Sequence, residues 1–317
     1  MESIKIILKL KSPVITPFLS DTIFGHFAWG VAFLKGEDEL KKLLSNFESS
    51  PFIVFSDGFE RGKLPKPYLE PYLMPVEYMD LNKKYKKTAF INKEWIFENI
   101  DNLTDEKIFE CYIKDKRIDN PCIEKVEKKP PKDKESMLEL KNSIDRLINK
   151  TTQGLYSIKL TFYKKDFEIE IYAKYDKEKI DLKTIKEVFD FIGKRGYGKD
   201  KSTGKGKFEC EIIEDFEEKS FFEIDEKRNF FLSLSTIFRC DDLVFSYGKK
   251  FTKFPKTGGS LAYSRPFKNP IIMYKSGSTF LIKNFKEYYG SAKDNVFNED
   301  GYYHSGYGIG IYFGAGA

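Results

Sequence analysis

The sequence predicts an α+β protein in which helices and antiparallel strands share a sizeable core. Apolar patterns in the first 216 residues run in the order strand, helix, two strands, helix, strand. After Asp215 the chain holds short apolar strand candidates, and helical periodicity is weak there. Aromatic residues, which favour strands, make up 16% of the chain. These observations predict a helix-covered sheet followed by a β-rich region.

The N-terminal part is expected to begin with a strand over residues 3–10, where apolar side chains alternate with charged ones. Ser20 or Asp21 is the expected N-cap of a helix that is apolar on nearly all sides. A second helix is expected over residues 37–47, and a short buried strand should follow at residues 51–55.

A charged insertion is expected at about residues 60–141. Residues 82–141 hold fifteen basic and thirteen acidic side chains, so the charges nearly balance. Short helices are expected over residues 93–100 and 105–111, and paired prolines at 130–131 break the pattern. We therefore expect the insertion to pack loosely on the core and to face a partner.

The first domain is expected to resume with a β-hairpin over residues 155–172. A helix over residues 181–192 and a strand over residues 207–213 follow. The resulting β-α-β-β-α-β order is that of a ferredoxin-like domain, which we place in residues 1–216 with the insertion inside it. Residues 217–317 are expected to form a second, β-rich domain.

The most informative segment is the basic glycine loop, residues 193–207, between the expected helix and strand. It holds five glycines and six basic side chains against one acid, Asp200. Glycine lets the backbone approach a ligand closely, and lysine and arginine neutralise phosphates. We therefore expect the loop to clamp an RNA backbone, with Lys199, Lys201 and Lys205 on phosphates.

Other interpretations of the basic glycine loop must be weighed. A nucleotide P-loop runs from strand to helix and has Ser or Thr after its lysine, whereas here the order is reversed and Asp200 follows Lys199. A dinucleotide fingerprint fails because Lys201 takes the place of its third glycine. These patterns argue against an NTP or NAD site, and no cofactor is expected. A solvated loop whose lysines serve solubility stays open.

Further side chains are expected to contact RNA. Arg146, Thr151 and Thr152 lie in a polar turn before the expected hairpin, where Arg146 could meet a phosphate or pair with Asp145. Tyr197 is flanked by glycines and is the best candidate for stacking on a base. The full set of expected RNA-contacting residues is Arg146, Thr151, Thr152, Lys194, Arg195, Gly196, Tyr197, Gly198, Lys199, Lys201, Ser202, Thr203, Gly204, Lys205 and Gly206.

Catalytic groups are scarce in this sequence. Of its two histidines, His26 lies in an apolar helix, where a packed role is expected, and His304 lies in a loop expected to be exposed. Asp241 and Asp242 form an adjacent pair near an apolar strand, which could bind Mg²⁺ or simply end the strand. We expect no catalytic residue and no metal site.

Composition bears on the source of any RNA affinity and on the cellular compartment. The net charge is only +5, so RNA affinity would have to come from local basic clusters. The four cysteines lack CxxC spacing and are expected to be reduced, which suits a cytoplasmic protein. The N-terminal strand contains lysines and does not resemble a signal peptide, and no apolar run reaches the ~20 residues of a membrane helix.

Five motifs occur in order along residues 20–278. They are SDTIFGHFAW after the first strand, SDGF followed by LPKP, NSIDR before a GLYS hairpin, GYGKDKSTGKGKF, and a late NPxxMxxxGS stretch. Together they resemble the RAMP-superfamily subunit of type III-A CRISPR (Csm) effector complexes, the fourth Csm subunit. The glycine-rich motif alone marks the wider RAMP superfamily, and the combination is more specific.

This resemblance implies two ferredoxin-like (RRM-like) domains in tandem, with the charged insertion in the first. It implies a non-catalytic subunit that grips the 5′ repeat-derived tag of the guide RNA (crRNA) in antiviral defence. It also implies two protein partners, a large palm-containing (polymerase/cyclase-like) subunit and the backbone RAMP subunit of the same complex, and no membrane.

Two other functions agree with the same sequence. A stand-alone RAMP endoribonuclease would process CRISPR repeat RNA with His26 as general base, because histidine titrates near neutral pH. A protein-only scaffold would contact its partners without RNA. Incubation with repeat RNA separates the first, because the enzyme would cleave it without metal. Loss of RNA binding after removal of the loop lysines would exclude the protein-only scaffold.

Overall fold

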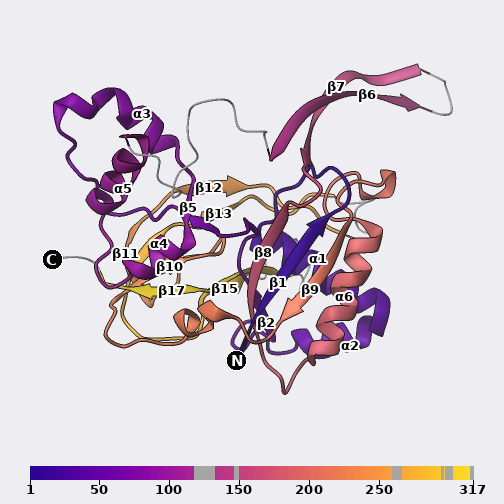
Figure 1. Ribbon diagram of the computed structural model, residues 1–317. Coiled ribbons are helices and arrows are strands. Elements are labelled where there is room, and N and C mark those ends of the chain that lie inside the picture. The colour runs from indigo at the N-terminus through magenta and orange to yellow at the C-terminus, as the bar shows by residue number, and fades with distance from the viewer. Residues whose placement is uncertain (118–132, 146–149, 259–265, 294–295, 297–302, 315–317) are drawn as a thin grey trace.

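The computed structural model describes residues 1–117, 133–145, 150–258, 266–293, 296 and 303–314. Helices and several antiparallel sheets make up the protein, so the predicted α+β class is confirmed (Figure 1). The helices are α1 (Ser20–Lys35), α2 (Glu37–Leu44), α3 (Met79–Lys87), α4 (Lys93–Glu98), α5 (Asp105–Arg117) and α6 (Leu182–Arg195), with 3₁₀ turns η1 (Val76–Tyr78), η2 (Lys201–Thr203) and η3 (Glu217–Phe222). None of the helices in the described ranges combines the length and apolar character that a membrane span requires.

The strands run through the whole chain. They are β1 (Glu2–Leu10), β2 (Ile53–Phe55), β3 (Phe59–Glu60), β4 (Lys63–Pro65), β5 (Phe90–Asn92), β6 (Lys134–Asp145), β7 (Lys150–Tyr163), β8 (Glu168–Tyr175), β9 (Phe208–Ile213), β10 (Phe230–Ser233), β11 (Leu243–Tyr247), β12 (Lys250–Lys253), β13 (Ile271–Tyr274), β14 (Thr279–Ile282), β15 (Tyr289–Lys293), β16 (His304–Gly308) and β17 (Gly310–Phe313).

The first sheet has the strand order β2-β8-β1-β9, with antiparallel neighbours, and β3 also pairs with β8. In its register Ile6 lies between Ile171 and Ile212, so apolar side chains form a row across the face that α1 and α6 cover (Figure 1). The elements β1, α1, β2, β8, α6 and β9 follow the β-α-β-β-α-β order of a ferredoxin-like unit.

Helices α1 and α6 pack closely over this face. Asp181 caps α6, because its carboxylate accepts the backbone N–H of Thr184 at 2.6 Å. The apolar stripe of α6 consists of Ile185, Val188, Phe189 and Ile192. A Cβ added to Gly30 of α1 would lie 2.6 Å from Cγ1 of Val188, so the glycine permits the two helices to approach.

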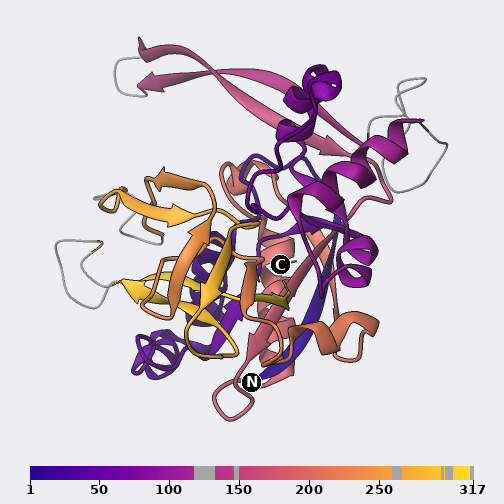
Figure 2. The ribbon, with the colours of Figure 1, turned by 90° about the vertical axis from the view of Figure 1, so that its left-hand side faces the viewer.

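Two strand assignments made from the sequence are wrong. The expected hairpin over residues 155–172 does not form, because β7 pairs with β6 and β8 joins β1 and β2 instead. Strand β2, the short buried strand expected at residues 51–55, takes the place in the β-α-β-β-α-β order that was assigned to the first strand of that hairpin. Apolar alternation predicts a strand but not its partner. The β6–β7 hairpin projects from the body of the molecule in both views (Figures 1 and 2).

The described part of the insertion is packed into the main core, contrary to the expectation that it packs loosely. Tyr85, Ile96 and Phe109 are each at most 2% exposed and belong to the main hydrophobic cluster. The N–H of Leu103 donates to the carbonyl of Gly314 at 2.9 Å, which ties the insertion to the C-terminal region. The two predicted short helices are present as α4 and α5. Both helices carry charged residues on one side and bury an apolar side. A count of charges does not reveal that apolar side, so it predicted loose packing.

The C-terminal region is β-rich, as the sequence predicts. Its four-stranded sheet has the order β11-β14-β10-β17, and β12–β13 and β15–β16 form two-stranded sheets. A ferredoxin-like unit needs two helices, and the described residues beyond Phe222 contain none, so the tandem arrangement is not confirmed. Leu232, Ile309 and Phe313 belong to the hydrophobic cluster that also contains the first sheet, so one continuous core joins the two regions.

Candidate RNA-binding site

The basic glycine loop joins α6 to β9, in the helix-loop-strand order that the sequence predicts. The segment between β1 and α1 anchors it. The N–H of Gly206 donates to the carbonyl of Pro13 at 2.8 Å, and the N–H of Lys199 donates to Oγ1 of Thr16 at 2.9 Å. Inside the loop, the N–H of Tyr197 donates to the carbonyl of Gly206 at 2.9 Å. These bonds fix the backbone from which the lysines project.

Most of the loop glycines serve this internal packing rather than access for a ligand. Gly206 has φ +70°, and a Cβ there would lie 2.1 Å from the carbonyl oxygen of Tyr197. Gly204 has φ +82° but faces open space, so a ligand could approach its backbone. The sequence interpretation was therefore too broad, because an added Cβ would also meet the chain itself at Gly193, Gly196 and Gly198.

Tyr197 is a core residue, so the prediction that its ring stacks on a base is wrong. The residue is 2% exposed, and its ring stacks on Phe18 with centroids 4.4 Å apart. Its hydroxyl donates to the carbonyl of Pro17 at 3.0 Å. The flanking glycines suggested an accessible ring, but they are what lets the chain fold back over Tyr197.

The cationic side chains of the loop face outward. The exposed polar residues are Lys194, Arg195, Lys199, Lys201, Ser202, Thr203 and Lys207. Lys205 is half-buried, with Nζ 4.0 Å from a carboxylate oxygen of Glu139. Partial burial and the nearby Arg195 charge lower the pKa of Lys201. The structure thus brings several exposed cations together, with Lys205 the least accessible.

Asp200 ties the loop to the projecting hairpin. Among the described residues it is the one non-glycine with positive φ, at 60°. Its carboxylate pairs with Lys141 of β6, which lies opposite Tyr156 of β7. Nζ of Lys199 is 5.8 Å from the centre of the Tyr156 ring. The hairpin neutralises the single acid of the loop, so the loop surface keeps its positive charge.

The turn residues expected to join this surface are only partly described. Arg146 lies outside the described residues, and Thr151 and Thr152 lie in a part of β7 whose side chains are also outside them. Thr151 is five residues from Tyr156, which is about 16 Å along an extended strand. Contact of these three residues with RNA stays a prediction.

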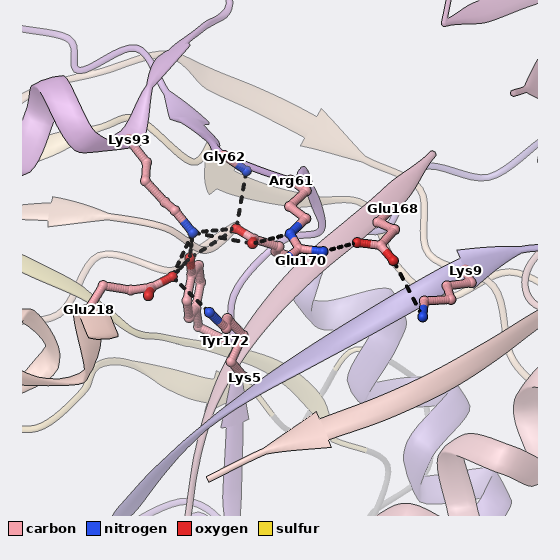
Figure 3. A network of polar contacts seen from close by, with 9 residues as sticks. All are labelled: Lys5, Lys9, Arg61, Gly62, Lys93, Glu168, Glu170, Tyr172 and Glu218. Carbon is pink, nitrogen blue, oxygen red and sulfur yellow. Dashed lines mark hydrogen bonds and ion pairs between the residues drawn. The ribbon is translucent and has the colours of Figure 1, made fainter. Parts of the chain in front are cut away.

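The uncovered face of the first sheet is not a platform for bases. RRM-type RNA-binding domains stack bases on aromatic side chains of that face. Here the face carries a network of ion pairs (Figure 3), in which Nζ of Lys93 lies 3.0 Å from Glu170 and 2.6 Å from Glu218. The ring of Phe222, at the end of η3, packs on Tyr172 with centroids 4.6 Å apart. The sheet is therefore occupied by the protein itself.

Electrostatics supports the same conclusion. Burial would raise the pKa of Glu218, but hydrogen bonds from Lys93 and Lys5 outweigh it and lower the pKa to about 2. Burial and the neighbouring carboxylates raise the pKa of Tyr172 well above its usual value. The acids that share this face of the sheet are Glu168, Glu170, Glu209 and Glu211. Lys9, Lys11, Arg61 and Lys93 pair with these carboxylates, so the cations of this face are engaged within the protein.

His26 is packed, as the sequence predicts. Its Nε2 accepts the backbone N–H of Gly198 at 3.0 Å, and its ring lies 4.6 Å from that of Tyr197. Burial and the charge of Lys201 lower the pKa of His26 to about 4, so the imidazole is neutral at pH 7. The accepting nitrogen is already engaged, which is a poor starting point for a general base.

His304 is buried, so the prediction of an exposed loop is wrong. It lies on β16, which packs against α1, and is 7% exposed. Its Nε2 is 2.9 Å from Oδ2 of Asp21. Burial would raise the pKa of Asp21, but His304 and the Lys253 charge outweigh it and hold the pKa at about 2. This buried pair joins α1 to the C-terminal region.

The N-terminus of α1 is capped by Asp57, which lies far along the sequence, and not by Ser20 or Asp21 as expected. The N–H of Ser20 donates to Oδ1 of Asp57 at 2.8 Å, and the N–H of Thr236 donates to the same oxygen at 3.0 Å. Asp57 is fully buried, and burial raises its pKa. The SDTIFGH and SDGF motifs therefore meet at a structural junction.

The aspartate pair has the geometry of a strand-end turn. Asp242 accepts a hydrogen bond from Asn284 at 2.7 Å and pairs with Lys286 at 2.5 Å, and the bond from Lys286 lowers its pKa. The N–H of Leu243 closes the turn on the carbonyl of Cys240 at 3.1 Å. In the described part of the chain, no group of three or more His, Cys, Asp or Glu side chains could hold a metal ion.

Sequence reasoning missed a second basic region. Residues 243–286 contain nine lysines and arginines and no acid, in a chain with 49 acidic residues. Its exposed lysines include Lys249, Lys250, Lys256 and Lys275, in and beside β12 and β13. A count of acid-free stretches would have found this region from the sequence.

Comparison with known proteins gives a match at the level of structure. No protein-family model matches the sequence, and no curated protein matches it. The structure of a Csm3–Csm4 subcomplex of a type III-A CRISPR–Cas interference complex is similar over 98% of this chain and 99% of that chain, with 20% identity and a TM-score of 0.57.

Two Csm1–Csm4 cassettes are also similar. The cassette with pppApA matches 99% of this chain and 98% of that chain, with 16% identity and a TM-score of 0.57. The cassette with cA4 matches 99% of both chains, with 14% identity and a TM-score of 0.58. Csm4 is the subunit common to all three structures. The chain therefore has the fold of Csm4, as seen in these Csm complexes, in agreement with the resemblance found in its sequence.

Proposed function

We propose that this chain is a non-catalytic guide-RNA-binding subunit of a type III-A CRISPR effector complex, which grips the 5′ repeat-derived tag of the crRNA in antiviral defence. The observation that carries the proposal is the basic glycine loop. Its backbone is fixed by the segment before α1, and its one acid is neutralised by Lys141. A rigid, positively charged loop suits phosphates, because little conformational freedom is lost on binding.

The proposed protein partners are a large palm-containing subunit and a backbone RAMP subunit, which this chain would bridge. Support comes from the similar structures, which were solved as complexes of Csm4 with Csm1 or with Csm3. We further propose that residues 1–216 and 217–317 are the two RRM-like units of the RAMP family, the second without α-helices in its described residues.

The endoribonuclease alternative has less support. A metal-independent ribonuclease needs a base and an acid within hydrogen-bond reach of the 2′-OH and the leaving oxygen. His26 is neutral, but its Nε2 already accepts the N–H of Gly198, and His304 is buried against Asp21. Lysine or tyrosine would have to supply both groups.

Co-expression tests the proposal. The chain is produced with the Csm-type proteins encoded beside it and with a CRISPR array, and the complex is purified through a tag on this chain. We expect both partner subunits and crRNA with an intact 5′ tag to co-purify. The protein alone should leave repeat RNA uncut in EDTA. Cleavage that is lost in His26→Ala with folding intact would favour the enzyme instead.

A further inference from the structure

The acid-free basic region forms a defined surface around β12 and β13. The two strands pair from Lys250 opposite Tyr274 to Lys253 opposite Ile271. Beyond β12 the chain continues to a bridge between Lys256 and Phe267, where the N–H of Lys268 donates to the carbonyl of Pro255 at 2.8 Å. Figure 2 shows the β12–β13 pair at the periphery of the molecule. The lysines are thus mounted on a fixed backbone.

Two large aromatic side chains stand exposed among these lysines. Phe254 is 66% exposed and Phe267 is 59% exposed. Nζ of Lys256 lies 5.1 Å from the centre of the Phe267 ring. Proteins that bind single-stranded nucleic acids combine exposed aromatic rings with nearby cations, because bases stack on the rings and phosphates contact the cations.

This surface lies beside the basic glycine loop, on the other side of α1. Lys253 pairs with Asp21 at 2.5 Å near the start of α1. His26, five residues further along α1, accepts the N–H of Gly198 in the loop. Five residues span about 7.5 Å of helix. The two contacts with α1 are therefore only about one and a half turns apart along its axis, so a strand of RNA that passes around α1 would meet both surfaces.

We propose that the β12–β13 surface is a second contact for single-stranded RNA, in which Phe254 and Phe267 stack on bases and Lys250, Lys256 and Lys275 meet phosphates. The proposal rests on the proposed function only in that the ligand is RNA. It extends the RNA path from the basic glycine loop around the start of α1. A partner protein would also bury exposed rings, and the test below separates that occupant from RNA.

The test measures binding of a fluorescent 12-nucleotide oligouridine to the full chain over a range of salt. Phe254→Ala/Phe267→Ala should raise Kd at least about tenfold, because a base–ring stack is lost at each position, and leave the salt slope unchanged. Lys250→Ala/Lys256→Ala/Lys275→Ala should lower the slope by up to roughly 2 units. Phe245→Ala, an exposed ring on β11, is the matched control and should change neither quantity.

Ultraviolet crosslinking to the same oligonucleotide, with identification of the linked peptides, separates the two surfaces. We expect crosslinks to peptides that contain Phe254 or Phe267 as well as to the loop. Crosslinks to the loop alone, with an unchanged Kd for the phenylalanine variant, would overturn this inference and leave the proposed function standing. Absence of crosslinks to both surfaces would contradict both. Loss of a protein partner from the lysine variant, with RNA binding intact, would assign the surface to protein. Thermal unfolding confirms that each variant is folded.

Discussion

The imidazole Nε2 of His26 accepts the backbone N–H of Gly198 at 3.0 Å. This bond joins α1 to the basic glycine loop, although the two residues are 172 positions apart. The neutral imidazole is the form that can accept it, and the low pKa of His26 keeps that form at neutral pH. The shape of the basic glycine loop is therefore linked to the protonation state of a residue in α1.

Acidification is expected to weaken the fold through this histidine. The pKa of His26 is about 4 in the folded protein, below the ordinary 6.5, so the unfolded chain binds the proton first. Stability is then lost as pH falls from 6.5 toward 4, by about 2 kcal/mol at pH 5. Urea unfolding at pH 7.5 and pH 5 measures the loss.

The matched variant for this prediction is His26→Gln, which does not titrate in that window. Between pH 7.5 and pH 5, the free energy of unfolding of this variant should fall less than that of the wild type. The difference between the two losses should be about 2 kcal/mol. A smaller loss will remain, because burial also lowers the pKa of His304. Equal losses in wild type and variant would show that His26 does not titrate with a lowered pKa.

Two loop glycines should differ in their tolerance of alanine. Both have positive φ, but Gly204 faces open space, whereas a Cβ on Gly206 would lie 2.1 Å from the carbonyl oxygen of Tyr197. Gly204→Ala should cost about 1–2 kcal/mol of stability from backbone strain alone. Gly206→Ala should cost clearly more and weaken RNA binding. Equal costs in urea unfolding would show that the loop does not pack on itself as described.

Tyr197 should contribute to stability and not to base stacking. Tyr197→Leu should lower the free energy of unfolding by on the order of 2 kcal/mol, because a packed ring and its hydroxyl bond are lost. The Kd for RNA, measured at a temperature where the variant is folded, should stay within about twofold. An affinity loss of tenfold or more in the folded variant would return Tyr197 to the RNA surface.

Lys93 should be essential to the face of the first sheet that lies opposite α1 and α6. It neutralises Glu170, which is 1% exposed, together with Glu218. Lys93→Met leaves these carboxylates without that cation and should cost about 3–5 kcal/mol. Lys9→Met, on the same face but half-exposed, should cost at most about 1 kcal/mol. A near-neutral Lys93 variant in denaturant unfolding would mean that solvent reaches this network.

Local sequence patterns correctly predicted the features that depend only on residues close together in the sequence. The α6–loop–β9 order follows from a change of apolar period on either side of the basic glycine loop, and the packed role of His26 follows from its apolar helix. The burial of Tyr197 and His304 could not be predicted, because their partners Phe18 and Asp21 lie far away in sequence. Contacts of this kind are set by topology.

The wrong strand pairing has a similar cause. Residues 155–162 alternate as a strand should, but nothing local distinguishes pairing with β6 from pairing with β8. The insertion was misjudged because its charges were counted without asking which side of each helix carries them. The acid-free region at 243–286 was visible in the sequence and needed only a charge count by segment.

The most direct test of the central claim is the salt dependence of RNA binding by a loop variant. Lys199→Ala/Lys201→Ala/Lys205→Ala should lower the slope of log K against log salt by up to roughly 2 units, with Lys205 contributing least because it is half-buried near Glu139. The matched control, Lys41→Ala/Lys42→Ala/Lys84→Ala, removes the same charge from exposed sites on α2 and α3 and should leave the slope unchanged. An unchanged slope in the loop variant, or an equal fall in both, would contradict the account.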